Sequence, residues 1–208
     1  MTGPFRTPYP GYDILDKWAS PSFDDATRNV LRLRRVPPPR RFLSEERYST
    51  LQALCATVIP QRRARPVEIA PWIDAALHEN RGTGTRFAVM PPDREAWPLG
   101  LDAIDAEAQA THDGKGFSDL PSTDRGRLLK AIDADKLRAR QAWHDMPAGK
   151  FFRAIALKQI VQFYYSQPAA MSEIGYGGPA APRGYVRLTA SGIDPWEAPF
   201  GNWKEERK

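Results

Sequence analysis

The stretch KFFRAIALKQIVQFYYS, residues 150–166, decides the fold, because it reads as a helix that is apolar over most of its circumference. Its polar side chains form one narrow stripe, made of Lys150, Arg153, Lys158, Gln162 and Ser166. A helix of this kind must be covered on most of its sides. We therefore expect a helix from just after Pro147 to about Gln167 that is either the centre of a helical domain or half core and half interface.

The residues before this stretch carry further helical signals. Ser44 is placed to cap a helix that runs to Val58 or Ile59, within which apolar residues recur at three- and four-residue spacing. Further helices are expected around residues 72–82, 91–112 and 122–132. The sequence shows no strand-pairing signal and no internal repeat. It predicts an all-α fold: a single compact domain of about five or six helices over residues 42–167, with irregular arms on both sides.

The two arms differ from the middle in composition. The chain holds 20 prolines, about twice the average usage of roughly 5%, and they cluster at the ends. Residues 1–41 combine prolines and spaced aromatic side chains with 8 basic and 4 acidic residues, and they include a short helix. Residues 168–208 hold 5 prolines and 6 glycines. Such arms gain order by burying their aromatic rings against another surface.

The C-terminal arm contains the loop Ile174-Gly175-Tyr176-Gly177-Gly178-Pro179, which needs the conformational range of glycine. We expect Gly177 and Gly178 to set its shape. Glycine loops that bind phosphate normally lead into the first turn of a helix. Here Pro179 and Pro182 follow, so no helix begins and a phosphate site is not indicated.

The sequence contains no recognisable catalytic or metal-binding constellation. The three histidines are isolated from one another: His78, His112 and His144. Cys55 lies on an apolar helix stripe, which favours a buried small hydrophobe over a nucleophile. Asp102 and Asp105 share a helix face that we expect to be solvated. We therefore expect no catalytic residue, no cofactor and no metal in this chain.

The sequence also lacks targeting signals of the usual kinds. It has no apolar run of 18 residues that could span a membrane. The N-terminus has no basic segment followed by an apolar one, so no signal peptide is expected in this chain.

Short motifs follow one another in a fixed order over roughly residues 42–198. They are Phe42-Leu43-Ser44-Glu45-Glu46, Val58-Ile59-Pro60, Trp72-Ile73-Asp74, Gly100-Leu101-Asp102-Ala103-Ile104-Asp105, Phe117-Ser118-Asp119-Leu120, Phe151-Phe152, Phe163-Tyr164-Tyr165-Ser166-Gln167-Pro168, Gly175-Tyr176-Gly177-Gly178 and Gly184-Tyr185. Their order and spacing resemble the gluconate 2-dehydrogenase subunit 3 family, the small or gamma subunit of bacterial flavin-dependent sugar and alcohol dehydrogenases.

The resemblance implies a non-catalytic partner of a GMC-type oxidoreductase. In such complexes the large subunit binds FAD and oxidises a sugar or another alcohol, and a cytochrome c subunit often takes the electrons. The small subunit serves the folding, stability or export of the large one, often through a twin-arginine signal. This sequence has a proline and aromatic arm in place of that signal. The complex is therefore expected in the cytoplasm, or in the periplasm if the large subunit carries the export signal.

We expect the partner surface to combine aromatic rings, glycines and an arginine: Tyr9, Tyr12, Trp18, Tyr164, Tyr165, Tyr176, Gly177, Gly178, Arg183, Tyr185 and Trp196. For the aromatic residues of the last helix, core packing is the competing interpretation. Two other functions stay open. One is a stand-alone enzyme or small-ligand-binding protein that uses the Gly175–Gly178 loop. The other is a basic scaffold protein whose N-terminal arm binds nucleic acid or an anionic membrane.

Overall fold

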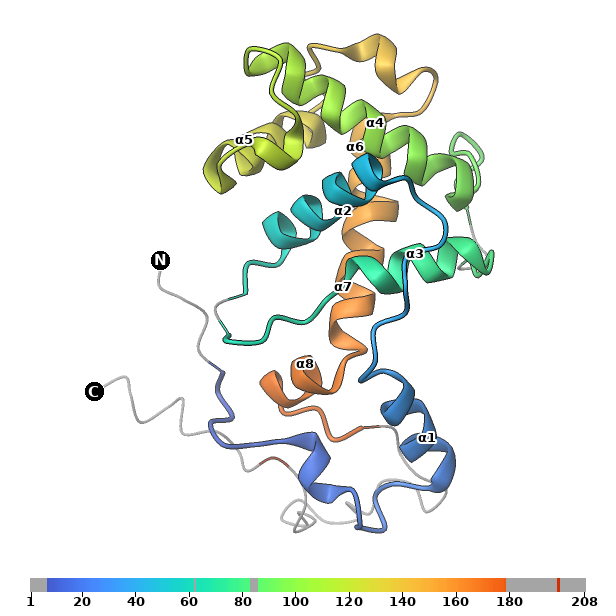
Figure 1. Cartoon of the computed structure of the whole chain (residues 1–208), viewed down its shortest axis with the longest axis vertical. Helices are drawn as coiled ribbons and strands as arrows, with labels where there is room; N and C mark the ends of the chain where they lie inside the picture. Colours follow the sequence, from blue (N-terminus) through green and yellow to red (C-terminus); the bar gives the residue numbers. More distant parts are fainter. Residues whose placement is uncertain (1–6, 62, 83–85, 179–197, 199–208) are drawn as a thin grey trace, which may run out of the picture. The chain divides into compact units, whose positions relative to one another are not determined.

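A computed structural model describes residues 7–61, 63–82, 86–178 and 198 (Figure 1). Within these residues the secondary structure is helical, without strands, which confirms the predicted all-α class. The chain forms two compact units. The helical unit is Pro37–Phe163, and the terminal unit combines Met1–Val36 with Tyr164–Lys208. Each is described separately below.

The helical unit begins with elements whose ends the sequence marks clearly. The Ser44 hydroxyl accepts a hydrogen bond from the backbone N–H of Arg47 and so caps the first helix, as expected. Pro71 stands in the first turn of the next helix, where its missing N–H costs nothing. The elements in order are α2 (Glu45–Val58), α3 (Ala70–His78), α4 (Asp93–Thr111), the 3-10 turn η2 (Phe117–Asp119), α5 (Ser122–Asp133) and the 3-10 turn η3 (Arg140–Trp143).

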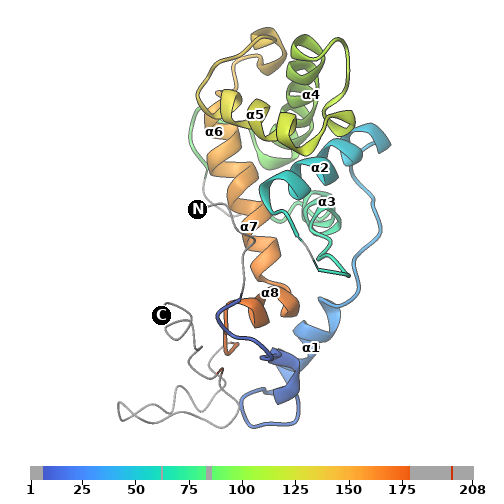
Figure 2. The same ribbon diagram turned by 90° about the vertical axis from the view of Figure 1, so that its left-hand side faces the viewer.

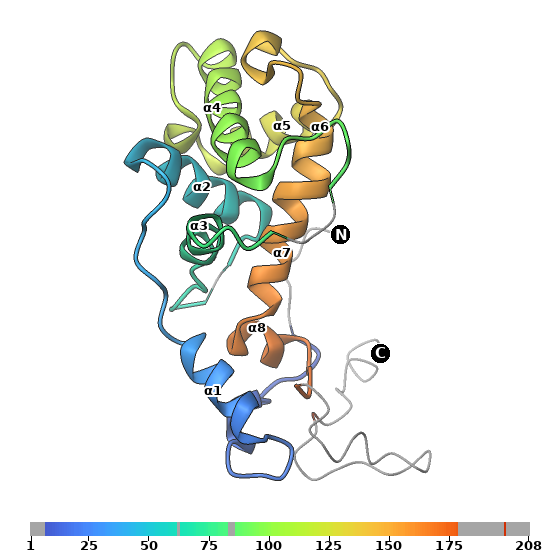
Figure 3. The ribbon, with the colours of Figure 1, turned by 90° about the vertical axis from the view of Figure 1, so that its right-hand side faces the viewer.

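The predicted long apolar helix is present and begins directly after Pro147. It runs without a break through α6 (Ala148–Lys150), η4 (Phe151–Leu157) and α7 (Lys158–Tyr165). The middle segment η4 is a π-helix, a wider winding that often occurs at functional sites. Both α4 and α5 lie against the α6–η4 end of this helix (Figures 2 and 3). Its first half is therefore the centre of the helical unit.

Phe151 lies at the centre of the core of the helical unit. Its ring lies edge-on to Trp97, with 5.6 Å between the ring centroids, and 5.9 Å from the ring of Trp143. All three side chains are buried. The ring also rests on the backbone of Gly100 in α4, where a methyl group would lie 2.2 Å from the Phe151 Cζ atom. Only glycine lets α4 approach the ring this closely.

Two buried carboxylates tie backbone segments to the helices. Asp74 of α3 accepts hydrogen bonds from the N–H groups of residues 41–43, at 2.6 Å from Arg41 and 2.8 Å from Leu43. Glu107 of α4 accepts from the N–H groups of Arg138 and Ala139 and from the indole N–H of Trp143. Each carboxylate therefore satisfies at least one donor that would otherwise be buried without a partner, such as the N–H of Leu43 or Ala139.

In its described part, the terminal unit contains three short helices. These are η1 (Ile14–Lys17), α1 (Asp25–Leu33) and α8 (Pro168–Glu173). Asp13 and Asp24 cap the first two through their carboxylates. The six-residue α8 is too short to show a periodic pattern in the sequence, and Pro168 in its first turn sets its start. A buried apolar cluster holds the unit together: Ile14, Phe23, Leu31 and Met171, with Tyr12, Leu15 and Trp18 packed against it.

The N-terminal residues 7–17 are hydrogen-bonded to the C-terminal residues 168–178, and we call this arrangement the clasp (Figure 1). The Thr7 hydroxyl donates to the Glu173 carbonyl at 2.7 Å, and the Ile14 N–H donates to the Ser172 hydroxyl at 3.0 Å. The Tyr12 hydroxyl donates to the Tyr176 carbonyl at 3.3 Å. Residues 7–17 and 168–178, which the sequence assigned to two separate arms, are thus held together in one folded unit.

Glycine is required at two positions of the clasp. Gly175 has φ +64°, and a methyl group there would lie 2.7 Å from the ring of Tyr9. Gly178 has φ +84°, and its methyl group would lie 3.1 Å from the ring of Phe23. Gly177 has neither constraint, since a methyl group there would meet only the Lys17 ammonium at 3.5 Å. The expected role of Gly178 is confirmed, whereas the second constraint lies at Gly175 and not at Gly177.

We predict that Gly100→Ala destabilises the helical unit by about 1–3 kcal/mol, because the new methyl group overlaps the Phe151 ring in a filled core. Urea unfolding followed by circular dichroism measures this change. Gly126→Ala is the matched control, because Gly126 lies within α5 with no atom within 4 Å of the added methyl group. This control should leave stability unchanged or raise it by up to about 1 kcal/mol. Equal effects of both substitutions would contradict the packing argument.

We predict that Gly175→Ala opens the clasp, because alanine is strained at a positive φ and its methyl group overlaps the Tyr9 ring. Hydrogen–deuterium exchange should then be faster in residues 7–17 and unchanged in α4. Gly177→Ala serves as the control and should leave the exchange of residues 7–17 as in the wild type. Unchanged exchange in the Gly175→Ala variant would refute the predicted requirement.

Candidate interaction surfaces and a pocket

The described residues contain no group of three metal-binding side chains, and none of their helices is long and apolar enough to cross a membrane. Cys55 is buried in α2, and this burial raises the pKa of its thiol to about 12. The thiol therefore stays protonated at neutral pH, which leaves it a poor nucleophile. Cys55 is a packing residue, as its apolar neighbours in the sequence predicted.

The acidic residues on α4 have structural partners. Asp102 forms a two-pronged ion pair with Arg47 of α2, with N–O distances of 2.8 and 2.7 Å. Asp105 accepts the backbone N–H of Phe117 at 2.8 Å and so holds the start of η2. Asp102 lies on an exposed helix face, as expected, and Asp105 is half-buried; in addition, each attaches a neighbouring element to α4.

The glycine loop of the terminal unit is occupied by the chain itself. The ring of Tyr9 covers Gly175, Phe23 faces Gly178, and the Lys17 ammonium donates a hydrogen bond to the Gly177 carbonyl. Lys17 is buried, and its ammonium lies 5.4 Å from the centroid of the Phe23 ring. A phosphate or a small ligand would have to displace these side chains in order to reach the loop.

The two tyrosines at the end of the long helix have different roles. Tyr164 is only 3% exposed, and its hydroxyl donates to the Glu173 carboxylate at 2.6 Å. Tyr165 is 40% exposed and packs edge-on against Tyr164. Tyr164 is therefore a core residue, which was the competing interpretation, whereas Tyr165 is open to a partner.

Several other apolar side chains of the terminal unit are also exposed. Tyr176 is 41% exposed, and so is Ile174, next to it in the loop. The exposed apolar set of the terminal unit is Val30, Leu33, Val36, Tyr165, Ile174 and Tyr176. Where exposed apolar side chains form a contiguous patch, they commonly mark an interaction surface. Sequence reasoning missed the three residues at and after α1, although the run Val30-Leu31-Arg32-Leu33 places apolar residues on more than one helix face.

Some of the remaining predicted interface residues are used within the terminal unit, and the others lie outside the described residues. Trp18 packs at 6.4 Å, centroid to centroid, against Phe23, and the Arg32 guanidinium lies over its ring, so Trp18 is largely used within the terminal unit. Tyr9 and Tyr12 belong to the clasp. Arg183, Tyr185 and Trp196 lie outside the described residues.

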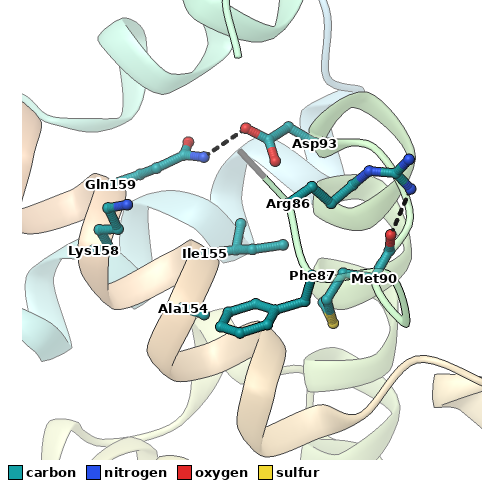
Figure 4. Close-up of a pocket in the computed structure, with 8 residues that line it drawn as sticks. All are labelled: Arg86, Phe87, Met90, Asp93, Ala154, Ile155, Lys158 and Gln159. Carbon is teal, nitrogen blue, oxygen red and sulfur yellow. Dashed lines mark hydrogen bonds between the residues drawn. The ribbon is translucent and has the colours of Figure 1, made fainter. Parts of the chain in front are cut away.

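The helical unit carries a pocket of about 270 Å³ that the sequence did not predict (Figure 4). One wall is the η4–α7 helix, and the facing wall is the segment that precedes α4. The lining residues are Arg86, Phe87, Met90, Asp93, Ala154, Ile155, Lys158 and Gln159. An apolar floor is thus combined with a charged rim. The sequence signal for it is Phe87-Ala88-Val89, a short apolar run outside any helix whose members are exposed.

Comparison with known proteins gives a family but no individual relative. The sequence pattern of the family described as gluconate 2-dehydrogenase subunit 3 matches residues 45–178. No curated protein and no solved structure gives a significant match. The matched range covers more than half of the chain and includes every element from α2 to α8. The chain therefore belongs to the gluconate 2-dehydrogenase subunit 3 family.

Proposed function

We propose that this chain is a non-catalytic small subunit that binds and stabilises a FAD-dependent GMC-type oxidoreductase acting on a sugar, a glycoside or another alcohol. The observation that carries this proposal is the family match over residues 45–178, because a protein described as a third subunit belongs to a dehydrogenase complex. FAD would be bound by the large subunit, and a cytochrome c subunit is a further candidate partner. The compartment of the complex follows the export signal of the large subunit.

The geometry of the described residues supports a binding role over catalysis. The carboxylates Asp74 and Glu107 are saturated with backbone and indole donors, and the Cys55 thiol is buried with a raised pKa. Such groups are poorly placed to exchange protons with a substrate. The exposed apolar set of the terminal unit, by contrast, offers the aromatic and aliphatic side chains that protein interfaces bury.

The two alternative functions have less support. A ligand site in the glycine loop conflicts with the clasp, in which Tyr9 and Phe23 already cover Gly175 and Gly178. A nucleic-acid or membrane surface needs free cations on the N-terminal arm. There, Arg28 pairs with Asp25, and Arg34 donates to the Ser166 carbonyl at 2.9 Å. Burial also lowers the pKa of Arg34, which marks it as part of the packed unit.

We predict that the chain co-purifies with a GMC-type flavoprotein when the two are co-expressed, and that the complex, not the isolated chain, carries flavin absorbance. The isolated chain should be less soluble than the complex, because its exposed apolar set stays in water. Absorbance spectra measure the bound flavin, and dye-linked alcohol oxidation measures the activity of the complex and of the isolated chain. A yellow and active preparation of the isolated chain would refute the proposal.

A variant pair locates the contact on the terminal unit. Tyr165→Asp combined with Tyr176→Asp should reduce the recovered flavoprotein, because each change places a charge on an apolar surface that binding would bury. Ala110→Asp is the control, since Ala110 is exposed on α4 of the helical unit. Equal recovery of the flavoprotein with both variants would show that the exposed apolar set is not part of the interface.

A further inference from the structure

We propose that the pocket of the helical unit, together with a second pocket adjoining it, docks an acidic segment of the dehydrogenase subunit, anchored by one large apolar side chain. This inference rests on the proposed function and adds a defined partner chemistry on the helical unit. The two pockets share Arg86, Asp93 and Gln159 in their linings and so adjoin each other, and we call the two together the docking groove.

The floor of the first pocket is built to receive an apolar group. Met90 and Ile155 are buried beneath it, and the small side chain of Ala154 leaves space above the helix (Figure 4). Phe87 forms the edge and is 55% exposed. The Lys150 ammonium, 4.6 Å from the centroid of the Phe87 ring, covers part of that ring. Burying an exposed aromatic ring of this size against a partner side chain gives a substantial gain in hydrophobic free energy.

The volume favours a single side chain over a cofactor. Pockets for drug-sized ligands and cofactors usually enclose roughly 300–1,000 Å³. At about 270 Å³ the first pocket, which would take the anchor, falls below that range, and the adjoining pocket of about 220 Å³ is lined by Arg81, Arg86 and Arg94. Interfaces, in contrast, commonly place one aromatic or aliphatic anchor in a pocket of the partner. A protruding side chain of another polypeptide fits this space better than a free cofactor does.

The wall of the groove is preformed. Gln159 is buried, and its carbonyl accepts the indole N–H of Trp97 at 3.1 Å while its amide donates to Asp93 at 2.8 Å. These bonds fix the side chain between the core and the groove. The π-helical winding of η4 carries Ala154 and Ile155 at the same wall. A wall held in this way loses little conformational entropy on binding.

The charge of the groove selects an acidic partner. Its lining contains four cationic side chains, Arg81, Arg86, Arg94 and Lys158, against the single carboxylate of Asp93. Arg81 pairs with Glu79, the Arg86 guanidinium donates to the Met90 carbonyl at 2.7 Å, and the Arg94 guanidinium lies 5.0 Å from the centroid of the Phe42 ring. Among the described residues, no carboxylate pairs with Arg86, Arg94 or Lys158. Asp93 is already bound by Gln159 and stands in the first turn of α4, where the helix dipole favours its charge. Carboxylates of a partner would find complementary cations here.

The test uses the complex of the full chain with its co-expressed flavoprotein and two matched pairs of variants. Ala154→Leu fills the first pocket, and Ala131→Leu adds the same side chain at a half-buried position of α5 outside the groove. Lys158→Glu reverses a groove charge, and Lys130→Glu reverses an exposed charge on α5. Circular dichroism of each variant establishes that it is folded before the affinity is measured by biolayer interferometry.

We expect Ala154→Leu to weaken binding about tenfold or more, as loss of an anchor pocket does. Lys158→Glu should weaken it about three- to tenfold at low salt, and this loss should shrink as salt screens the charges. The two α5 variants should bind as the wild type does. A photo-reactive benzoylphenylalanine in place of Phe87 should cross-link to a carboxylate-rich segment of the flavoprotein that contains a large apolar residue.

The outcomes separate this inference from the proposed function. If the wild-type chain binds the flavoprotein and the groove variants bind equally well, the docking groove is refuted while the accessory role stands. Cross-linking to a second copy of this chain, or to a flavoprotein segment without carboxylates, would refute it as well. If the wild-type chain does not bind any GMC-type flavoprotein, both proposals fall.

Discussion

The contact between the Phe151 ring and the bare backbone of Gly100 sets the spacing from which the helical unit is built. It lets α4 approach the long helix closely enough for Trp97 and Trp143 to close around the same ring. Gln159 of the long helix then accepts the indole N–H of Trp97, and Glu107 of α4 accepts that of Trp143, so these bonds link α4 to the long helix and to η3. Gln159 in turn fixes the groove wall. A packing requirement in the core therefore determines the geometry of a surface feature.

Two buried carboxylates also organise the helical unit. Asp74 and Glu107 each organise a stretch of backbone that has no regular secondary structure of its own. In each segment one of the bonded N–H groups is buried, that of Leu43 or of Ala139, and such a group needs a partner inside the protein. Asp74 belongs to one of the motifs by which the family is recognised, and its structural duty gives a physical reason for an acidic residue at that position.

Much of the fold could be predicted because its signals are local. The serine cap of α2, the proline before α6 and the apolar character of residues 150–166 each act within a few residues, so the sequence alone reveals them. The contact of Phe151 with Gly100 could not be predicted, because the two residues are far apart in the sequence. A glycine in a sequence does not reveal which side chain packs against its backbone. Which of Gly175, Gly177 and Gly178 must be glycine depends on the sign of φ at each residue, and the sequence does not reveal that sign. The docking groove was missed because the segment from Arg86 to Asp93 has no periodicity.

The clasp has a consequence for the order of events during synthesis. Thr7 and Glu173 are separated by 166 positions, and at about 5–20 residues per second the ribosome needs roughly 8–30 seconds to pass from one to the other. Throughout that interval the clasp partners Ser172, Glu173 and Tyr176 have not yet been made, whereas the segments of the helical unit from α2 to η4 are completed before them. The terminal unit therefore forms last. Its closure reports that the polypeptide has been made at least as far as Gly178.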